Sequence, residues 1–341
     1  MNAELIDIKA TRRVEQSKLE FVSSGDFVRD FEPPNYLIDQ VMQRRFIYSL
    51  TAPTGGGKTA IALRVAANIA LGESLAGKDV EQGHVLYLAG ENPDDLRMRW
   101  IAQADVMGFD PEKISVTFLP SIIEISKSFK EVKKFSSSVG GLAFVIVDTS
   151  AAYFGGDNEN DNTQMAEHAR NLRSFTTIEG RPAVLLLCHP TKNAKKGSAL
   201  QPRGGGSFLA EIDGNIVGKK ANDRHIVTLS PHDKFRGVPF DPLVFKLESK
   251  TTEGLKDSKG QLIPTVVASP LNGQDWETVK SGGKTAPQDV LLSAMQQNSG
   301  RSFQEYADEI GKTKRQVQSM MEKLKNQGIV EKGTNNRYQL T

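Results

Sequence analysis

The sequence has few of the features that mark secreted or membrane proteins. Its single cysteine, Cys188, excludes an internal disulfide and suits a reducing compartment. Its apolar runs all fall short of the roughly 18 residues that a membrane-spanning helix needs, and its first residues lack the apolar stretch of a signal peptide. We therefore expect a cytoplasmic protein with no membrane partner.

The chain also carries little net charge. Lysine and arginine number 43 against 41 aspartate and glutamate residues, a formal charge of +2 over 341 residues. This balance excludes a polycation that coats nucleic acid along its whole surface, so any such contact must come from local basic patches. The length is sufficient for two domains with a sizeable core.

What the sequence does contain is an alternation of apolar strands with helical patterns. Near-continuous apolar runs are typical of parallel strands buried on both faces. They lie at 44–52, 83–91, 114–120, 142–150 and 182–190. After Gly204, short strands separated by turn residues predict antiparallel hairpins that extend the sheet. We expect an α/β core, a parallel sheet with helices on both faces.

The rest of the chain is predicted to form an arm, a linker and a small module. Residues 1–45 are polar and lack clear periodicity, so we interpret them as an N-terminal arm that precedes an α/β domain at 46–279. The composition of "KSGGKTAP" predicts a linker over 280–286. Residues 287–341 predict three helices and a two-stranded wing, the pattern of a winged helix-turn-helix.

A phosphate-binding loop is the strongest single motif. The stretch "APTGGGKT" (Ala52–Thr59) fits G-x-x-x-x-G-K-[ST], with alanine in the first glycine position, a strand before it and a helix after it. Glycines let successive N–H groups point at phosphate oxygens, and the helix N-terminus adds positive charge. Lys58 should reach the β- and γ-phosphates, and Thr59 should hold Mg²⁺. The expected nucleotide contacts are Pro53, Thr54, Gly55, Gly56, Gly57, Lys58, Thr59 and Ala60.

Polar side chains follow three of the apolar strands. Asp148 is expected to hold a magnesium-bound water, unless it merely caps its strand. Glu91 is the candidate base for the attacking water, with a helix-capping box around Asn92 as the alternative. His189 is placed to hydrogen-bond the γ-phosphate if its strand ends at the same crevice. Tyr36 is a candidate for stacking on the base of the nucleotide.

The order of these motifs resembles that of the RepA-like branch of the RecA/DnaB ATPases, which includes hexameric plasmid replicative helicases. The stretches "APTGGGKT", "YLAGENP", "VIVDT", "CHPTK" and "RGGGSFLAEIDGN" carry the resemblance over roughly residues 35–247. It implies a RecA-like core in a hexameric ring. It also implies that Glu91 is the catalytic carboxylate, Asp148 the Walker B acid and His189 the γ-phosphate sensor.

This chain departs from the resemblance at one position. The plasmid helicases carry a trans-acting arginine where this chain has "EIDGNIV" (211–217), which contains no arginine. The stretch "HDKFRGVP" (232–239) is similar to the Lys-x-Arg fingers of DnaB-type helicases, so Lys234 and Arg236 are expected to complete a neighbour's site. An exposed basic turn is the alternative, and Arg203 is a second finger candidate.

Two segments are candidate DNA contacts. The loop after His189 suits a path along a single strand, although it could be a solvated loop; its basic residues are Lys192, Lys195, Lys196 and Arg203. Residues 312–341 hold seven basic residues and two acids, net +5. This composition favours duplex DNA, although winged helices also dock on proteins. The expected duplex contacts are Lys312, Lys314, Arg315, Gln318 and Arg337.

Together these features predict a DNA-binding motor that forms a ring and hydrolyses ATP, a replicative helicase-like ATPase of a plasmid, phage or integrated element. The expected cofactors are ATP and Mg²⁺, since the sequence has no Asn/Thr-Lys-x-Asp motif for reading guanine. A second hypothesis is a non-motor, ATP-regulated DNA-binding protein, such as a loader. A recombinase-like filament ATPase is the third.

Overall fold

The structure is a computed structural model of the chain. It describes residues 21–191, 200–221, 225–271, 291–292, 294–295, 300–326, 328–333 and 337–340. Contacts divide the chain into one unit at 1–34 and a second at 35–341. In the first unit, helix α1 spans Ser24–Val28 and buries none of its residues.

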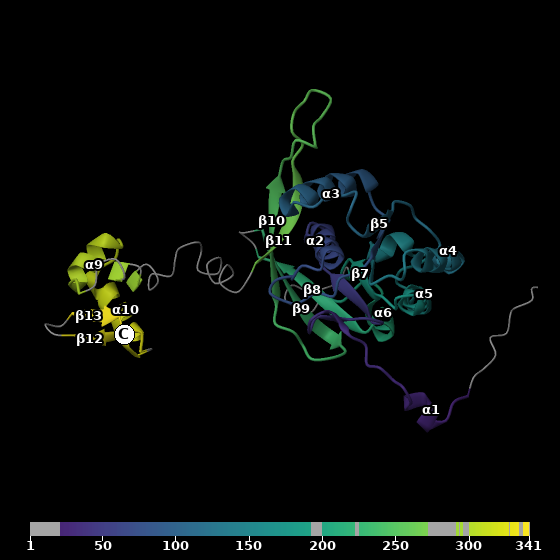
Figure 1. Cartoon of the computed structure of the whole chain (residues 1–341), viewed down its shortest axis with the longest axis horizontal. Helices are drawn as coiled ribbons and strands as arrows, with labels where there is room; N and C mark the ends of the chain where they lie inside the picture. Colours follow the sequence, from purple (N-terminus) through teal and green to yellow (C-terminus); the bar gives the residue numbers. More distant parts are fainter. Residues whose placement is uncertain are drawn as a thin grey trace, which may run out of the picture. The chain divides into compact units, whose positions relative to one another are not determined.

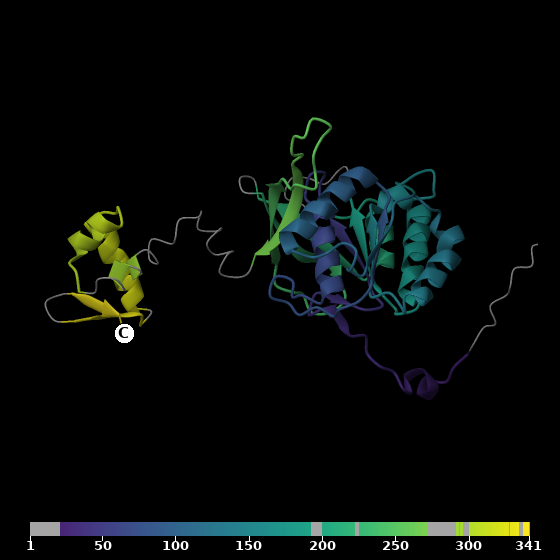
Figure 2. The ribbon, with the colours of Figure 1, turned by 45° about the horizontal axis from the view of Figure 1, so that its top comes forward.

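The second unit contains one large sheet with helices on both sides (Figures 1 and 2). Within the described residues the sheet has nine strands in the order β11-β10-β9-β8-β3-β7-β6-β4-β5. The strands are β3 (Ile47–Thr51), β4 (Val85–Ala89), β5 (Val116–Leu119), β6 (Phe144–Asp148), β7 (Ala183–Cys188), β8 (Gly214–Lys220), β9 (Ile226–Phe235), β10 (Leu243–Lys250) and β11 (Thr265–Leu271). Pairing is parallel from β8 through β5 and antiparallel from β8 through β11. The predicted α/β sheet with an antiparallel extension is confirmed.

Alternate strand residues face two separate cores, because successive side chains of a strand point to opposite sides of the sheet. Tyr48 and Leu50 of β3 pack in a core with the helices α2 (Lys58–Leu71) and α3 (Pro93–Met107). Ile47 packs in the opposite core. The helices of that side are α4 (Ile125–Ser138), α5 (Asn162–Arg173) and α6 (Gly205–Glu211), with the short 3-10 helices η1 (Ser150–Tyr153) and η2 (Ser174–Thr177).

The packed domain begins earlier than the sequence pattern suggested. Strands β1 (Tyr36–Ile38) and β2 (Met42–Gln43) form an antiparallel pair just before β3. Four apolar residues of this pair and of the turn between its strands are buried in the core on the α2 side: Leu37, Ile38, Val41 and Met42. The boundary between the two units lies after residue 34 and not at the predicted 45/46. So short a hairpin carries too few residues to show a periodic pattern.

A smaller group of elements lies near the C-terminus. It comprises α9 (Phe303–Glu309), α10 (Lys314–Asn326), β12 (Val330–Lys332) and β13 (Tyr338–Leu340). The two strands pair antiparallel. Residues 291–292 and 294–295 are helical, and the predicted linker at 280–286 lies outside the described residues. Val317, Met321 and Leu324 of α10, whose spacing puts them on one helix face, are buried in a hydrophobic cluster of this segment.

None of the helices in the described parts of the chain is long and apolar enough to cross a membrane.

Candidate functional site

The phosphate loop, Ala52–Thr59, connects the carboxyl end of β3 to α2. Gly55 and Gly57 have φ values of 72° and 81°, which side chains rarely adopt. A Cβ on Gly57 would lie 2.6 Å from Leu247 Cδ1, so a larger residue would collide with the wall of the site. Ala52 is not among the described residues with positive φ. Its backbone therefore accommodates alanine where the motif usually has glycine.

A cavity of about 420 Å³ opens over this loop, within the range of small-molecule sites, roughly 300–1,000 Å³. Glu91 and His189 line it together with the glycines of the loop. The rest of its wall comes from α3, the end of β8, His225, β10 and β11. Sequence reasoning missed the residues of that wall, which include Arg99, Lys220, His225, Glu248, Ser249 and Val266. They carry no local motif, because the antiparallel part of the sheet brings most of them to the loop from far along the chain.

Lys58 lies at the inner face of the phosphate loop. It is 7% exposed, and its ammonium donates to the carbonyl oxygens of Ala52 at 2.8 Å and Pro53 at 3.1 Å. Burial lowers the pKa of this ammonium, while the nearby carboxylates Asp148 and Glu91 raise it. The lysine therefore stands as a poorly solvated cation between loop carbonyls and acids, where phosphate oxygens can replace the carbonyl contacts.

Asp148 is the buried acid at the end of β6. Its Oδ2 accepts a hydrogen bond of 2.6 Å from the hydroxyl of Tyr87, a residue that sequence reasoning did not select. Burial raises the pKa of Asp148 to about 6, against the lowering effects of Tyr87 and of the nearby Thr59 hydroxyl. Oδ1 is buried and has no hydrogen-bond partner among the described residues. An unpartnered carboxylate oxygen near a hydroxyl fits the oxygen ligands that Mg²⁺ takes, as predicted for Thr59 and Asp148.

Glu91 and His189 face each other across the cavity. His189 Nε2 lies 4.0 Å from Glu91 Oε1, and His189 Nδ1 lies 3.5 Å from Lys58 Nζ. Burial and the Lys58 charge both lower the pKa of His189, so its imidazole is neutral at pH 7. The cap of α3 is the side chain of Asn92, which accepts from the Asp94 N–H. Glu91 takes no part in that cap, so its carboxylate is available to the cavity.

The strand order explains why these groups meet. β3, β7, β6 and β4 are adjacent and parallel, so their carboxyl ends lie along one edge of the sheet. The phosphate loop follows β3, His189 follows β7, Asp148 ends β6 and Glu91 follows β4. Functional side chains of open α/β sheets gather at this edge. The arrangement can hold a triphosphate, orient a water through Glu91 and contact the terminal phosphate through His189.

Tyr36 lies away from this edge. It pairs with Gln43, whose N–H donates to the hydroxyl of Tyr48 at 3.0 Å. Tyr48 is near the start of β3, whereas the phosphate loop follows the end of that strand. The prediction that Tyr36 stacks on the base does not fit this position, because the whole strand separates it from the loop of its own chain.

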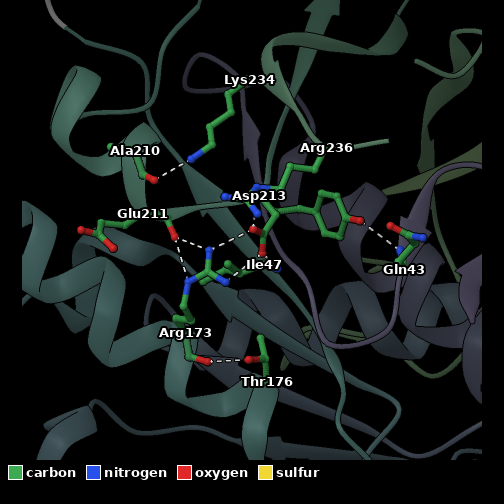
Figure 3. Close-up of polar contacts among 10 residues, drawn as sticks. Gln43, Ile47, Arg173, Thr176, Ala210, Glu211, Asp213, Lys234 and Arg236 are labelled. Carbon is green, nitrogen blue, oxygen red and sulfur yellow. Dashed lines mark hydrogen bonds and ion pairs between the residues drawn. The ribbon is translucent and has the colours of Figure 1, made fainter. Parts of the chain in front are cut away.

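Lys234 and Arg236 lie near the start of β3, at the edge of the sheet opposite the phosphate loop. Figure 3 shows them beside Asp213 and Ile47. Phe235 between them pairs with Gly214, which in turn pairs with Tyr48 of β3. The four residue steps of β3 alone span roughly 13 Å, so neither side chain reaches the phosphate loop of the same chain. The Arg236 side chain is 63% exposed. Both cations therefore lie at the edge of the sheet opposite their own nucleotide site.

Arg203, the second finger candidate, lies beside the cavity of its own chain. Its N–H donates to the carbonyl of His189 at 2.8 Å, and its guanidinium pairs with Glu159 at 2.7 Å. This position places Arg203 next to His189, at the edge of the sheet that holds its own nucleotide site. The other three residues predicted to contact single-stranded DNA lie outside the described residues: Lys192, Lys195 and Lys196.

The predicted duplex contacts lie on the surface of the C-terminal segment. Lys314, Arg315 and Gln318 are exposed in the first turns of α10. Arg337, which precedes β13, is exposed, and Lys312 is partly exposed. The basic residues therefore keep their charges in water, where they could meet a polyanion.

Comparison with protein families agrees with the geometry of the nucleotide site. The AAA domain family matches residues 13–195, more than half of the chain. The match includes the phosphate loop, Glu91, Asp148 and His189, and it ends before β8. Among curated proteins, none matches the chain significantly. With this match, and with the phosphate loop, Glu91, Asp148 and His189 at adjacent strand ends, the chain belongs to the AAA domain family of P-loop ATPases.

Proposed function

We propose that the chain is an ATP-driven motor that acts on DNA as a ring of identical subunits, as a helicase-like replication ATPase. One observation carries the proposal. The phosphate loop, Glu91, Asp148 and His189 lie at one edge of the sheet. Lys234 and Arg236 lie at the opposite edge. If these cations take part in hydrolysis, they act on a neighbour. A contact that joins opposite edges of identical subunits repeats head to tail and closes into a ring or continues as a filament.

The chemistry of the site supports hydrolysis at such a composite pocket. Glu91 is half exposed beside the cavity and can orient and deprotonate a water. His189, neutral and 3.5 Å from Lys58, can report the loss of the terminal phosphate to the loop that follows it. An arginine from a neighbour would neutralise the charge that develops as the terminal bond breaks, an effect worth roughly 10³–10⁵ in rate. Mg²⁺, held through Thr59 and Asp148, would supply further charge neutralisation.

Duplex DNA is the partner proposed for the C-terminal segment. Its helices, its antiparallel hairpin and its local core are the parts expected of a winged helix. The exposed start of α10 carries Lys314 and Arg315, and residues 312–341 have a net charge of +5. Such a module would bring the ring to a chosen duplex, as needed at a replication origin of a plasmid, phage or integrated element.

A non-motor ATPase that regulates DNA binding is the second candidate, because one observation favours it. The loop after η1 carries Asp157, Glu159 and Asp161, and Glu159 pairs with Arg203, one of the expected single-strand contacts. This pairing removes one cation from the surface that a single strand would need.

The test combines hydrolysis, unwinding and electron microscopy of the full chain. We expect closed rings with a non-hydrolysable ATP analogue, hydrolysis stimulated by single-stranded DNA, and displacement of a strand from a forked duplex.

Variants test the trans finger. Arg236→Ala should bind ATP normally and lose roughly 10³-fold or more in kcat. Lys256→Ala, at an exposed residue of the β10–β11 connection, should keep the wild-type rate. Rings without strand displacement would favour the regulator, and open filaments the recombinase-like alternative. A strict monomer with full turnover at high dilution would refute both the ring and the trans finger.

A further inference from the structure

The two finger residues belong to a cluster centred on one buried acid, Asp213 (Figure 3). Asp213 is 3% exposed and stands just before β8. Its Oδ2 accepts from the Ile47 N–H at 3.0 Å, and its carboxylate receives both terminal nitrogens of Arg173, at 3.0 and 3.1 Å. The Nε of Arg236 lies 3.3 Å from Oδ1. One carboxylate thus joins the finger arginine, a second arginine and the first residue of the strand that leads to the phosphate loop.

The two arginines are held very differently. Arg173 binds the carboxylate with two nitrogens, and its guanidinium also donates to the Glu211 carbonyl through Nε, at 3.0 Å, and Nη2. Its side chain is 35% exposed. The backbone N–H of Arg236 donates to the Asp213 carbonyl at 2.8 Å, but its side chain makes only the 3.3 Å contact and is 63% exposed. An arriving anion can therefore draw Arg236 away, while Arg173 remains as the permanent counter-charge of the buried acid.

Lys234 is oriented by a separate contact. Its ammonium donates to the carbonyl of Ala210 at 2.5 Å, in the last turn of α6. Burial lowers its pKa, and the neighbouring Arg236 lowers it further. Two arginines thus bind one carboxylate, Asp213, with the Lys234 ammonium close by, while Arg170 pairs with Glu211. Four cations against two carboxylates leave an excess of positive charge at this edge of the sheet. An electropositive, partly exposed site of this kind suits a phosphate group.

We propose that Asp213 is a positioning residue for catalysis in the neighbouring subunit: it holds Arg236, next to Lys234, in the place from which the arginine reaches the neighbour's terminal phosphate. This inference rests on the proposed function, since it needs a neighbour whose nucleotide site meets this edge. Asp213 touches no substrate. It acts through Arg236, and Arg173 keeps the acid neutralised when Arg236 engages the phosphate.

Single variants of the full chain provide the first test. Asp213→Asn keeps a carbonyl oxygen for the Ile47 N–H but loses the charge that orients Arg236. We expect kcat to fall about 10- to 100-fold, less than for Arg236→Ala, with unchanged KM for ATP and unchanged ATP binding. Arg170→Gln is the matched control, because Arg170 pairs with the side chain of Glu211 at 3.2 Å in the same α5–α6 contact. It should keep the wild-type kcat.

Mixed rings separate an effect on the neighbour from an effect on the same chain. Glu91→Gln subunits cannot hydrolyse ATP but carry an intact finger, whereas Asp213→Asn subunits carry an intact site and a misplaced finger. Each variant alone should be slow. An equal mixture should recover roughly a quarter of the wild-type rate, because about one random interface in four joins an intact site to an intact finger.

The possible results distinguish this inference from the proposed function. Wild-type kcat in Asp213→Asn, together with a severe loss in Arg236→Ala, would overturn the inference and leave the finger in place. A slow Asp213→Asn variant that the mixture does not rescue would also overturn it, since the acid would then act on its own site through Ile47 and β3. Wild-type kcat in Arg236→Ala would remove the trans finger itself, and this inference with it.

Discussion

His168 makes the stability of this protein depend on pH in a way that can be calculated. Its Nε2 lies 3.0 Å from the hydroxyl and 3.1 Å from the carbonyl oxygen of Ser150. Phe154 meets the imidazole edge-on and Phe208 stacks on it. The residue is 5% exposed, and burial lowers its pKa to about 4, although the Ser150 carbonyl and Glu159 oppose this change. The folded protein therefore keeps this imidazole neutral.

The sign of the effect follows from the two pKa values of His168. The folded-state pKa of about 4 lies below the ordinary 6.5, so between these values the unfolded chain binds a proton that the folded protein does not. The stabilisation is fully present above pH 6.5 and is lost as the pH falls toward 4. Between pH 7 and pH 5 this histidine alone costs about 2 kcal/mol of unfolding free energy. Asp148, whose pKa is raised to about 6, acts in the opposite direction over the same range.

The assay compares wild type with His168→Gln, because the Asp148 contribution is the same in both. Both are unfolded in urea at pH 7 and pH 5 without nucleotide, in a Trp276→Phe background, so that fluorescence reports the buried Trp100 of α3. Between the two pH values, wild type should lose about 2 kcal/mol more than the variant, roughly 0.5–1 M in urea midpoint. Equal losses in the two proteins would refute the assignment of a buried, neutral imidazole.

Three further predictions concern the nucleotide site and the C-terminal segment. Tyr87→Phe removes a hydrogen bond that lowers the pKa of Asp148, so in the protein without nucleotide and Mg²⁺ the pKa of this carboxyl, followed by infrared titration, should rise from about 6 by roughly one pH unit; an unchanged pKa would contradict this. Gly57→Ala puts a Cβ 2.6 Å from Leu247 Cδ1 at a φ of 81°, so calorimetry should show ATP binding weakened by about 10-fold or more. Unchanged affinity for ATP would mean that the loop or Leu247 shifts to accommodate the added methyl group, and would contradict this prediction. Met321→Ala should destabilise the C-terminal segment by about 2–5 kcal/mol and abolish salt-sensitive duplex binding, with hydrolysis in the absence of DNA unchanged. Duplex binding that persists after this segment melts would place the DNA contact elsewhere.

Most of the fold was accessible from the sequence because its signals are local. The apolar runs that predicted strands all lie in the sheet, and a helix follows the phosphate loop, as the motif required. The hairpin at 36–43 was missed because it is too short to show a period. The start of the packed domain was therefore set too late.

The candidate site was only partly predictable from the sequence, because only some of its residues carry a local signal. Lys58, Glu91 and Asp148 each follow or end an apolar strand, which is a signal that a single stretch of sequence carries. The hydroxyl of Tyr87 on Asp148 and the wall contributed by β10 give no such signal. They depend on which strands become neighbours, and residues far apart in the sequence meet there.

The sequence alone determined the chemistry that this protein can perform: a glycine loop with a lysine, and acids and a histidine at strand ends, because short-range geometry dictates these groups. The tertiary structure alone decided which of these groups meet. The strand order brings Lys58, Asp148, Glu91 and His189 to one edge of the sheet and carries Arg236 to the other, where Asp213 binds it. The side of a sheet on which a residue lies depends on long-range pairing between strands, and no stretch of neighbouring residues specifies that pairing.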